Sequence, residues 1–349
     1  MINVRRNYPD FGSFVNAMNE YVKFEKNDID VRIVRTDIKE SKKAIDEFLR
    51  GGGFKEKERY GCIIHITKVI TLYGKKQIVN ILLYYDEIWK TFYLFTNEGI
   101  SKMDIVLNFV DNHRNFHEIW LPPSDFEEFS DDLLDKETGE LIYFKAERDK
   151  SILCDRRPEI YRKTEYQGKD GRLVLKEWKI EYGVLPVKLE FHFPDKGVFK
   201  IYRSGRFVFR YGNFKFFILD IVKEFILHAI KIDKIFEDSI FDVKIIDGFP
   251  SYTMKTVEIE LTKGFDKQKY EEFISLLEKN NFATYNEVLS DEGILASGYV
   301  VDKNKNEIFS LALSGSSISL LPKYKAKYHS LHRFYRFIVE NINSSAKCR

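Results

Sequence analysis

The sequence has few cysteines and no long hydrophobic run. Its three cysteines, Cys62, Cys154 and Cys348, are far apart and form no CxxC or Cys/His metal-binding pattern. We therefore expect no zinc site and no disulfide framework, and we predict a reducing, cytoplasmic compartment. The most apolar stretch, residues 214–232, is interrupted by five charged residues, and the N-terminus lacks an apolar signal segment. No membrane span or signal peptide is predicted.

A strong net charge is also absent. The 56 Lys+Arg residues nearly balance the 54 Asp+Glu residues, which leaves a net charge of +2. The field of the whole molecule therefore does not attract nucleic acid or an anionic membrane, and any electrostatic binding surface must come from local segregation of charge. Proline is scarce, with 8 residues, whereas there are 30 Phe and 20 Tyr. This composition excludes a disordered or collagen-like chain and predicts cores packed with aromatic rings.

Alternating strand patterns dominate the chain and are interrupted by a few segments of helical periodicity. Residues 30–36 alternate as a strand, residues 38–49 place apolar side chains on one helical face, and three glycines then end that helix. A similar order returns from residue 256 onward. We therefore predict an α+β protein of repeated β-α-β-β-β(-β)-α units, with antiparallel curved sheets covered by helices on one face. The predicted divisions are an N-terminal segment (1–27), a first unit (28–118), an acidic connecting segment (119–150), a central strand-rich unit (151–250) and a C-terminal unit (251–349).

The central unit contains the clearest local signal, a β-hairpin over residues 196–212. Ser204 and Gly205 occupy the position of a two-residue turn between two alternating runs. This turn would place Arg203 opposite Arg206, on a face where arginines alternate with apolar side chains. Guanidinium groups bind phosphates and apolar side chains contact sugars or bases, so nucleic acid is the predicted ligand. An ordinary exposed sheet face is the alternative. The predicted contact residues are Lys200, Arg203, Arg206, Arg210 and Lys215.

A family resemblance supports this interpretation. The sequence VFKIYRSGRFVFRYGNFKFF at residues 198–217 has a weaker counterpart, IFSLALSGSSISLLPKYK, at residues 308–325. Both segments resemble the end of a repeat of the TATA-box-binding-protein fold, which runs β-α-β4-α and has a short Ser-Gly turn in the corresponding place. The resemblance implies a sheet that curves over DNA, with the helices on the outside. This chain differs from that family in its three predicted units and its acidic insertion.

One set of residues suggests catalysis. Asp170, Glu177 and Lys179 supply the residue types of a Mg²⁺-dependent nuclease, in which carboxylates hold the metal and a lysine orients the attacking water. Residues 172–182 are predicted to form a strand, on which Glu177 and Lys179 would share a face. Short motifs of this kind arise readily in a chain of which 32% is charged, so these residues are an alternative to a binding function.

We predict structural roles for the histidines near residue 115 and near the C-terminus. His113 and His117 are four residues apart and could ligate a metal from one helical face. A helix terminus between residues 112 and 115 favours a capping role instead, because histidines interact favourably with the carbonyl ends of helices. His329 and His332 are expected on the outer surface of a basic C-terminal helix. No metal ligand and no cofactor are predicted.

The acidic segment and the basic hairpin together define the functional hypotheses. Residues 124–140 hold eight acidic residues and one lysine, a pattern typical of a solvated helix face or a partner surface. We predict a nucleic-acid-binding protein, with DNA as the expected ligand and no membrane partner. One alternative is a non-catalytic protein-interaction, regulatory or inhibitor module that presents the acidic segment. The other is the Mg²⁺-dependent nuclease.

Overall fold

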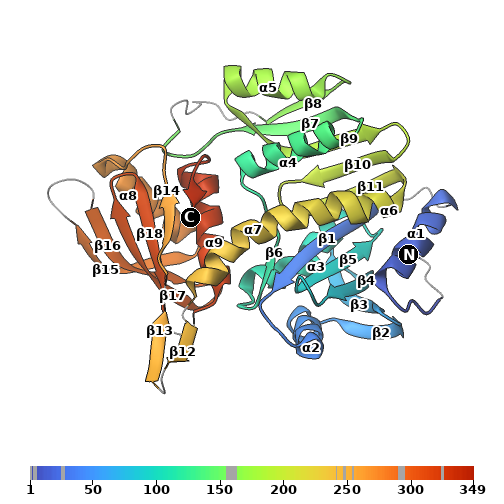
Figure 1. The fold of residues 1–349 in the computed structure, drawn as a ribbon, viewed down its shortest axis with the longest axis horizontal. Helices are drawn as coiled ribbons and strands as arrows, with labels where there is room; N and C mark the ends of the chain where they lie inside the picture. Colours follow the sequence, from blue (N-terminus) through green and yellow to red (C-terminus); the bar gives the residue numbers. More distant parts are fainter. Residues whose placement is uncertain are drawn as a thin grey trace.

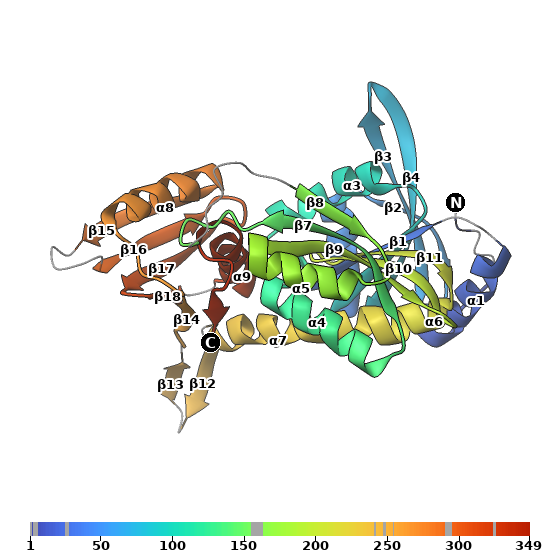
Figure 2. The same ribbon diagram turned by 90° about the horizontal axis from the view of Figure 1, so that it is seen from above.

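The computed structural model is an α+β protein with two large antiparallel sheets (Figure 1, Figure 2). It describes residues 2, 6–24, 28–154, 163–240, 242–246, 249–253, 255–289, 295–323 and 326–349. The α+β class predicted from the sequence is confirmed. Within these ranges, no helix combines the length and the apolar character that crossing a membrane requires.

The first unit begins after helix α1 and follows the order β-α-β-β-β-β-α-β. The elements of this part are α1 (Phe11–Phe24), β1 (Ile29–Thr36), α2 (Ser41–Gly52), β2 (Lys55–Tyr60), β3 (Ile63–Leu72), β4 (Lys75–Asp86), β5 (Thr91–Thr96), α3 (Ile100–Asn112) and β6 (Phe116–Glu118). Helix α2 ends as expected, because Gly53 adopts a left-handed conformation at φ 64° and its N–H bonds to carbonyls of the last turn. Strand β1 pairs with β5, so the lateral order is β2-β3-β4-β5-β1.

The central part of the chain continues the same sheet. Its elements are α4 (Pro123–Lys136), β7 (Glu140–Arg148), β8 (Lys163–Gln167), α5 (Gly171–Tyr182), β9 (Val184–Phe193), β10 (Gly197–Tyr202), β11 (Arg206–Gly212) and a long helix made of α6 (Phe214–Phe216), a π-helical segment (Phe217–Val222) and α7 (Lys223–Ser239). Strand β11 pairs with β1, and the order continues as β1-β11-β10-β9-β7-β8. The sheet therefore runs across the boundary predicted between the first and central units.

Helices cover this long sheet unevenly. On β1 to β5, helices α2 and α3 pack on one face, where the Phe48 and Phe92 rings stack 4.5 Å apart, and α1 and α6 pack on the other. On β11 to β7, the helices α4, α5 and α7 pack on one side, around buried residues such as Phe191 and Phe207 (Figure 2). The other side of these strands carries the charged and tyrosine side chains of the candidate site.

The C-terminal unit forms its own sheet, with β12 (Asp242–Ile246) and β13 (Phe249–Thr253) as a separate two-stranded ribbon before it. The unit consists of β14 (Val257–Glu260), α8 (Lys267–Lys279), β15 (Phe282–Leu289), β16 (Leu295–Asp302), β17 (Glu307–Ser314), β18 (Ser317–Pro322), α9 (Tyr328–Phe337), a π-helical segment (Ile338–Ile342) and β19 (Lys347–Cys348). Its strand order, β15-β16-β17-β18-β14, is the order of β2-β3-β4-β5-β1 in the first unit. Descent of the units from one repeated ancestor stays a prediction.

The strand predicted over residues 172–182 is wrong, because these residues belong to helix α5. Leu175 and Trp178 are three residues apart, so they lie on one side of the helix, and the Trp178 ring meets Phe144 of β7 edge-on at 5.4 Å. Gly183 ends the helix in a left-handed conformation, and its N–H donates to the Lys179 carbonyl at 3.0 Å. The packing of this segment against β7 and β9 therefore favoured a helix, although its apolar residues alternate as they do in a strand.

A buried lysine fastens the C-terminal unit to the first unit. Lys305 lies in the turn between β16 and β17 and is 3% exposed. Its Nζ donates to the carbonyl oxygens of Val110, His113 and Phe116 at 2.8, 2.9 and 2.8 Å. These carbonyls belong to the end of α3 and the segment that leads into β6. The ammonium of one unit thus caps a helix of the other.

We predict that Lys305→Met destabilises the protein by on the order of 3 kcal/mol, because three buried carbonyls lose their donor. Urea unfolding followed by circular dichroism measures the change. Lys303→Met, at an exposed position in the same turn, is the matched control and should change the unfolding midpoint little. Equal midpoints for the two variants would contradict the proposed role of Lys305.

Candidate functional site

The basic hairpin forms, but its predicted register is wrong. The loop contains three residues, Arg203, Ser204 and Gly205, so Tyr202 pairs with Arg206 and Phe199 pairs with Phe209. Gly205 has φ 73°, and a Cβ atom at this position would lie 2.2 Å from the Ile119 carbonyl oxygen. The last position of this three-residue loop therefore requires glycine. The extra loop residue shifts one strand by one position relative to the prediction, which moves its side chains to the other face.

This shift in register places the apolar and the charged residues of the predicted mixed face on opposite sides of the sheet. Phe199 and Ile201 lie with Phe207 and Phe209 on the helix-covered side, and all four are buried. The charged residues of the hairpin, Lys200, Arg206 and Arg210, lie on the opposite side with Tyr202. The predicted alternation of arginine with apolar side chains on one face is therefore wrong, because each strand has one apolar and one mainly polar face.

The five predicted contact residues have different environments. Arg206 is buried and pairs with Asp30 of β1, at 2.6 and 2.7 Å. Arg210 is 44% exposed and donates to Glu190 of β9 at 2.9 Å, whereas the Lys200 ammonium lies 3.7 Å from the same carboxylate.

The remaining two predicted residues lie away from these. Arg203 is in the hairpin loop, where its backbone bonds to Val187 and Leu121. Burial lowers the pKa of its guanidinium. Lys215 is exposed on α6, which packs on the helix-covered side of the sheet. The structure therefore brings together Lys200, Arg206 and Arg210 and places the other two elsewhere.

The same side of the sheet carries residues that the sequence analysis did not identify. The strand register places Tyr143 opposite Glu190, Lys145 opposite Lys188, and Tyr202 opposite Lys188. The Lys188 ammonium lies 4.4 Å from the centre of the Tyr143 ring and 5.7 Å from that of Tyr202. The alternation of β7 and β9 gave a signal for each strand, but the sequence did not reveal which strands lie side by side.

We call this surface the open face. It comprises seven cationic residues, five acidic residues and three tyrosines on β1 and β7 to β11: Arg32, Lys145, Lys163, Lys188, Lys200, Arg206, Arg210; Asp30, Glu140, Glu147, Glu165, Glu190; Tyr143, Tyr202, Tyr211. Among the described residues, no carboxylate lies within ion-pair distance of Lys188. Burial, and then the nearby Lys200, lowers the pKa of Lys188. Cations are therefore crowded at the centre of the open face.

The nuclease residues do not form a site of the predicted kind. Glu177 and Lys179 are two residues apart on helix α5, so they point in different directions and do not share a strand face. Lys179 pairs with Glu127 of α4, and Tyr166 donates to Asp170. The shared strand face on which the nuclease hypothesis depended is absent.

The acidic segment is engaged within the protein. It forms helix α4, whose Asp131 accepts from Arg172 of α5 at 2.8 Å and lies 3.2 Å from Lys176. Asp135 also pairs with Arg172, at 2.8 Å. Helix α5, which the sequence did not predict, therefore supplies cations to part of this acidic surface.

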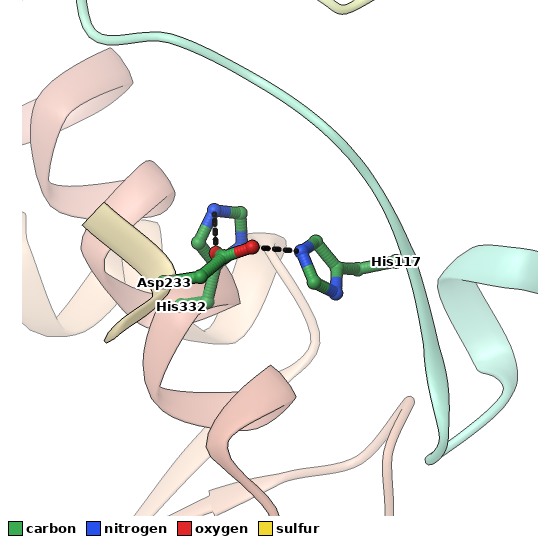
Figure 3. A group of neighbouring side chains, drawn as sticks. All are labelled: His117, Asp233 and His332. Atoms are coloured by element: carbon green, nitrogen blue, oxygen red, sulfur yellow. Dashed lines mark hydrogen bonds and ion pairs between the residues drawn. The ribbon is translucent and has the colours of Figure 1, made fainter. Parts of the chain in front are cut away.

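The histidines form the buried group that sequence analysis missed. Helix α3 ends at Asn112 with His113 as its C-cap residue, and His117 lies on strand β6, so the two histidines do not share a helical face. The exposed positions expected for His329 and His332 are wrong: they are 0% and 4% exposed on α9, which packs against α7. Figure 3 shows the Asp233 carboxylate of α7 between the rings of His117 and His332. The aromatic residues that alternate with these histidines on α9 were a signal for burial.

Comparisons with known proteins add a relationship but no activity. The AF_0896_M family middle domain matches residues 126–204, which span α4 to the hairpin loop. The chain is also similar to a protein of Archaeoglobus fulgidus that is described as uncharacterized. The two are 23% identical over 331 residues, which cover 87% of this chain and 86% of the relative. The similarity thus extends through both sheets.

We predict that Arg206→Ala destabilises the protein by about 3 kcal/mol, because it leaves Asp30 buried without its closest cation. Arg210→Ala should cost less than about 1 kcal/mol, because the Arg210 side chain is half-exposed. Urea unfolding of both variants measures the difference. If Arg210→Ala destabilised the protein as much as Arg206→Ala, the assignment of Arg206 as the structural arginine would be wrong.

Proposed function

We propose that the open face binds nucleic acid, preferably a single strand. The observation that carries this proposal is a sheet face, uncovered by the helices that pack on its other side, where seven cations and three tyrosines lie among five acids. Cationic side chains bind phosphates, and tyrosine rings offer stacking surfaces for unpaired bases.

The cations at the centre of the open face have donor hydrogens that are available to bind phosphate. Lys200 and Arg210 share the carboxylate of Glu190, and Arg210 Nε also lies 4.0 Å from Asp28 Oδ1. These carboxylates cannot occupy all the donor hydrogens of the two cations. Lys188 contacts two tyrosine rings and no carboxylate among the described residues. A phosphate near these three residues would therefore gain charge-assisted hydrogen bonds without displacing a buried ion pair.

The tyrosines favour an unpaired strand over a duplex. Tyr143, Tyr202 and Tyr211 lie on three different strands of the open face, and Tyr211 is 58% exposed. A single strand can turn its bases toward such rings, whereas the bases of a duplex are stacked on each other. The resemblance to the TATA-box-binding-protein fold favours DNA, and RNA is the other ligand with this chemistry.

We predict that Lys188→Gln combined with Lys200→Gln reduces the salt dependence of oligonucleotide binding. Each lost phosphate contact lowers the slope of log K against log salt by about 0.7, so the double variant should lose about 1.4. Fluorescence anisotropy with labelled single-stranded and duplex DNA and RNA measures the slopes.

The matched control for this experiment is Lys267→Gln with Lys279→Gln, two exposed lysines of α8 in the C-terminal unit. It changes the net charge equally and should leave the slope unchanged. If both double variants lowered the slope to the same extent, binding would be nonspecific attraction to the whole protein. Absence of binding at low salt would refute the proposed function.

We predict that Tyr143→Leu and Tyr202→Leu each weaken binding of a single strand by about 1–3 kcal/mol, because a base loses its stacking partner. Binding of duplex should change less. Tyr285→Leu is the control, since Tyr285 lies on β15 of the other sheet, where it is 55% exposed. Equal effects of all three substitutions would contradict a stacking role for the open face.

The protein-interaction alternative has a different surface. The C-terminal sheet has a hollow of about 460 Å³ lined by small and hydroxyl side chains, including Ser297, Ser310 and Ser319, with Tyr299 and Leu321 beside them. Such a lining suits a polypeptide better than a phosphate backbone. Retained binding of a protein partner by the Lys188/Lys200 variant, with no nucleic-acid binding by the native protein, would favour this alternative.

A further inference from the structure

Three segments that are far apart in the sequence place metal-ligating side chains together. His117 comes from β6, Asp233 from α7 and His332 from α9, and their side chains are at most 7% exposed. His117 Nε2 lies 3.0 Å from Asp233 Oδ2, and His332 Nε2 lies 3.5 Å from Asp233 Oδ1. One ligand atom from each residue lies within 4.8 Å of the other two. Figure 3 shows that both imidazole rings are directed at the carboxylate.

The three residues supply a donor set that suits a metal. Two imidazoles and a carboxylate, held on three separate elements, are ligands that zinc commonly binds in proteins.

The hydrogen bonds behind His117 are incomplete without a cation. His117 Nδ1 lies 2.7 Å from His329 Nδ1, and His329 Nε2 lies 3.7 Å from Asp37 Oδ1. If His117 is neutral and donates from Nε2 to Asp233, its Nδ1 must accept the proton of His329 Nδ1. His329 Nε2, without a proton, then faces a carboxylate oxygen. Both atoms lack a hydrogen-bond partner, as does Asp233 Oδ1.

A cation on His117 Nε2 resolves this arrangement. The proton of His117 would move to Nδ1 and donate to His329 Nδ1, and the proton of His329 would point from Nε2 toward Asp37. This is the chain of outer partners that metal-bound histidines commonly have.

We propose that His117, Asp233 and His332 bind a zinc ion, with His329 and Asp37 as positioning residues, and that the ion joins α9 of the C-terminal unit to β6 and α7. The ion would be enclosed, so it would enter as the chain folds and its role would be structural. The nitrogen-rich donor set favours zinc and similar transition metals over Mg²⁺ or Ca²⁺. This site is independent of the open face.

Metal analysis of the full chain tests the proposal. The protein is unfolded in denaturant with a chelator, then refolded with Zn²⁺, with Co²⁺ or with neither, and dialysed. We expect one metal ion per chain, visible absorption of four- or five-coordinate Co²⁺, and a higher unfolding temperature for the metal-loaded protein. Folded native protein that carries no zinc after refolding with Zn²⁺, and shows no such Co²⁺ spectrum, would overturn the proposal. A proton on His117 would then complete the network.

Variants separate ligands from positioning residues. His332→Gln should abolish stoichiometric binding, whereas His329→Gln should weaken it by about 10–100-fold, as the loss of an outer partner does. His192→Gln, at a half-exposed position on β9, is the control and should bind as the native protein does. If His332→Gln failed to fold, the refolding experiment on the native chain would still decide. Full Zn²⁺ binding by folded His332→Gln would overturn the assignment of ligands.

Discussion

The structure depends on the burial of charge in strand β1. All eight residues of this strand are buried, and three of them, Asp30, Arg32 and Arg35, are charged. A buried charge is tolerated only with a partner, so the surrounding elements must supply one for each. Asp30 pairs with Arg206 of β11, Arg32 reaches Asp104 of α3, and Arg35 pairs with Asp233 of α7. These pairs fix how the two halves of the long sheet meet and how α7 lies across them.

Because side chains alternate along β1, these charged side chains lie on two different faces of the sheet. Asp30 and Arg32 point to the open face, and Arg35, an odd number of residues away, points to the opposite side, where the histidine cluster lies. The two candidate sites are therefore organised by one strand but are separated by the sheet. A substitution on the open face can change ligand binding without touching the histidines. A substitution at Asp30 or Arg206 would also change stability, because these two residues form a buried ion pair.

Features that depend on a few neighbouring residues were predicted correctly from the sequence, whereas the pairing of strands was not. The α+β class, the end of α2 at Gly53 and the existence of the hairpin at residues 196–212 follow from signals within a few residues. The hairpin register does not, because two- and three-residue loops both use a glycine, and the sequence near the turn fits either loop. Helix α5 was predicted as a strand because its apolar residues alternate. The contacts with β7 and β9 that favour the helix cannot be read from the sequence. The acids that balance the basic hairpin, Asp30 and Glu190, lie on other strands.

The histidine cluster shows why a site assembled by the fold escapes motif searches. Cysteine spacing argued against zinc, and that argument addresses only ligands close together in the chain. His117, Asp233 and His332 are separated by roughly one hundred residues each and meet because α7 leads from the first sheet to the second. Each charged or imidazole group needs the other two, so the cluster specifies one arrangement of the two units where apolar packing alone would allow several.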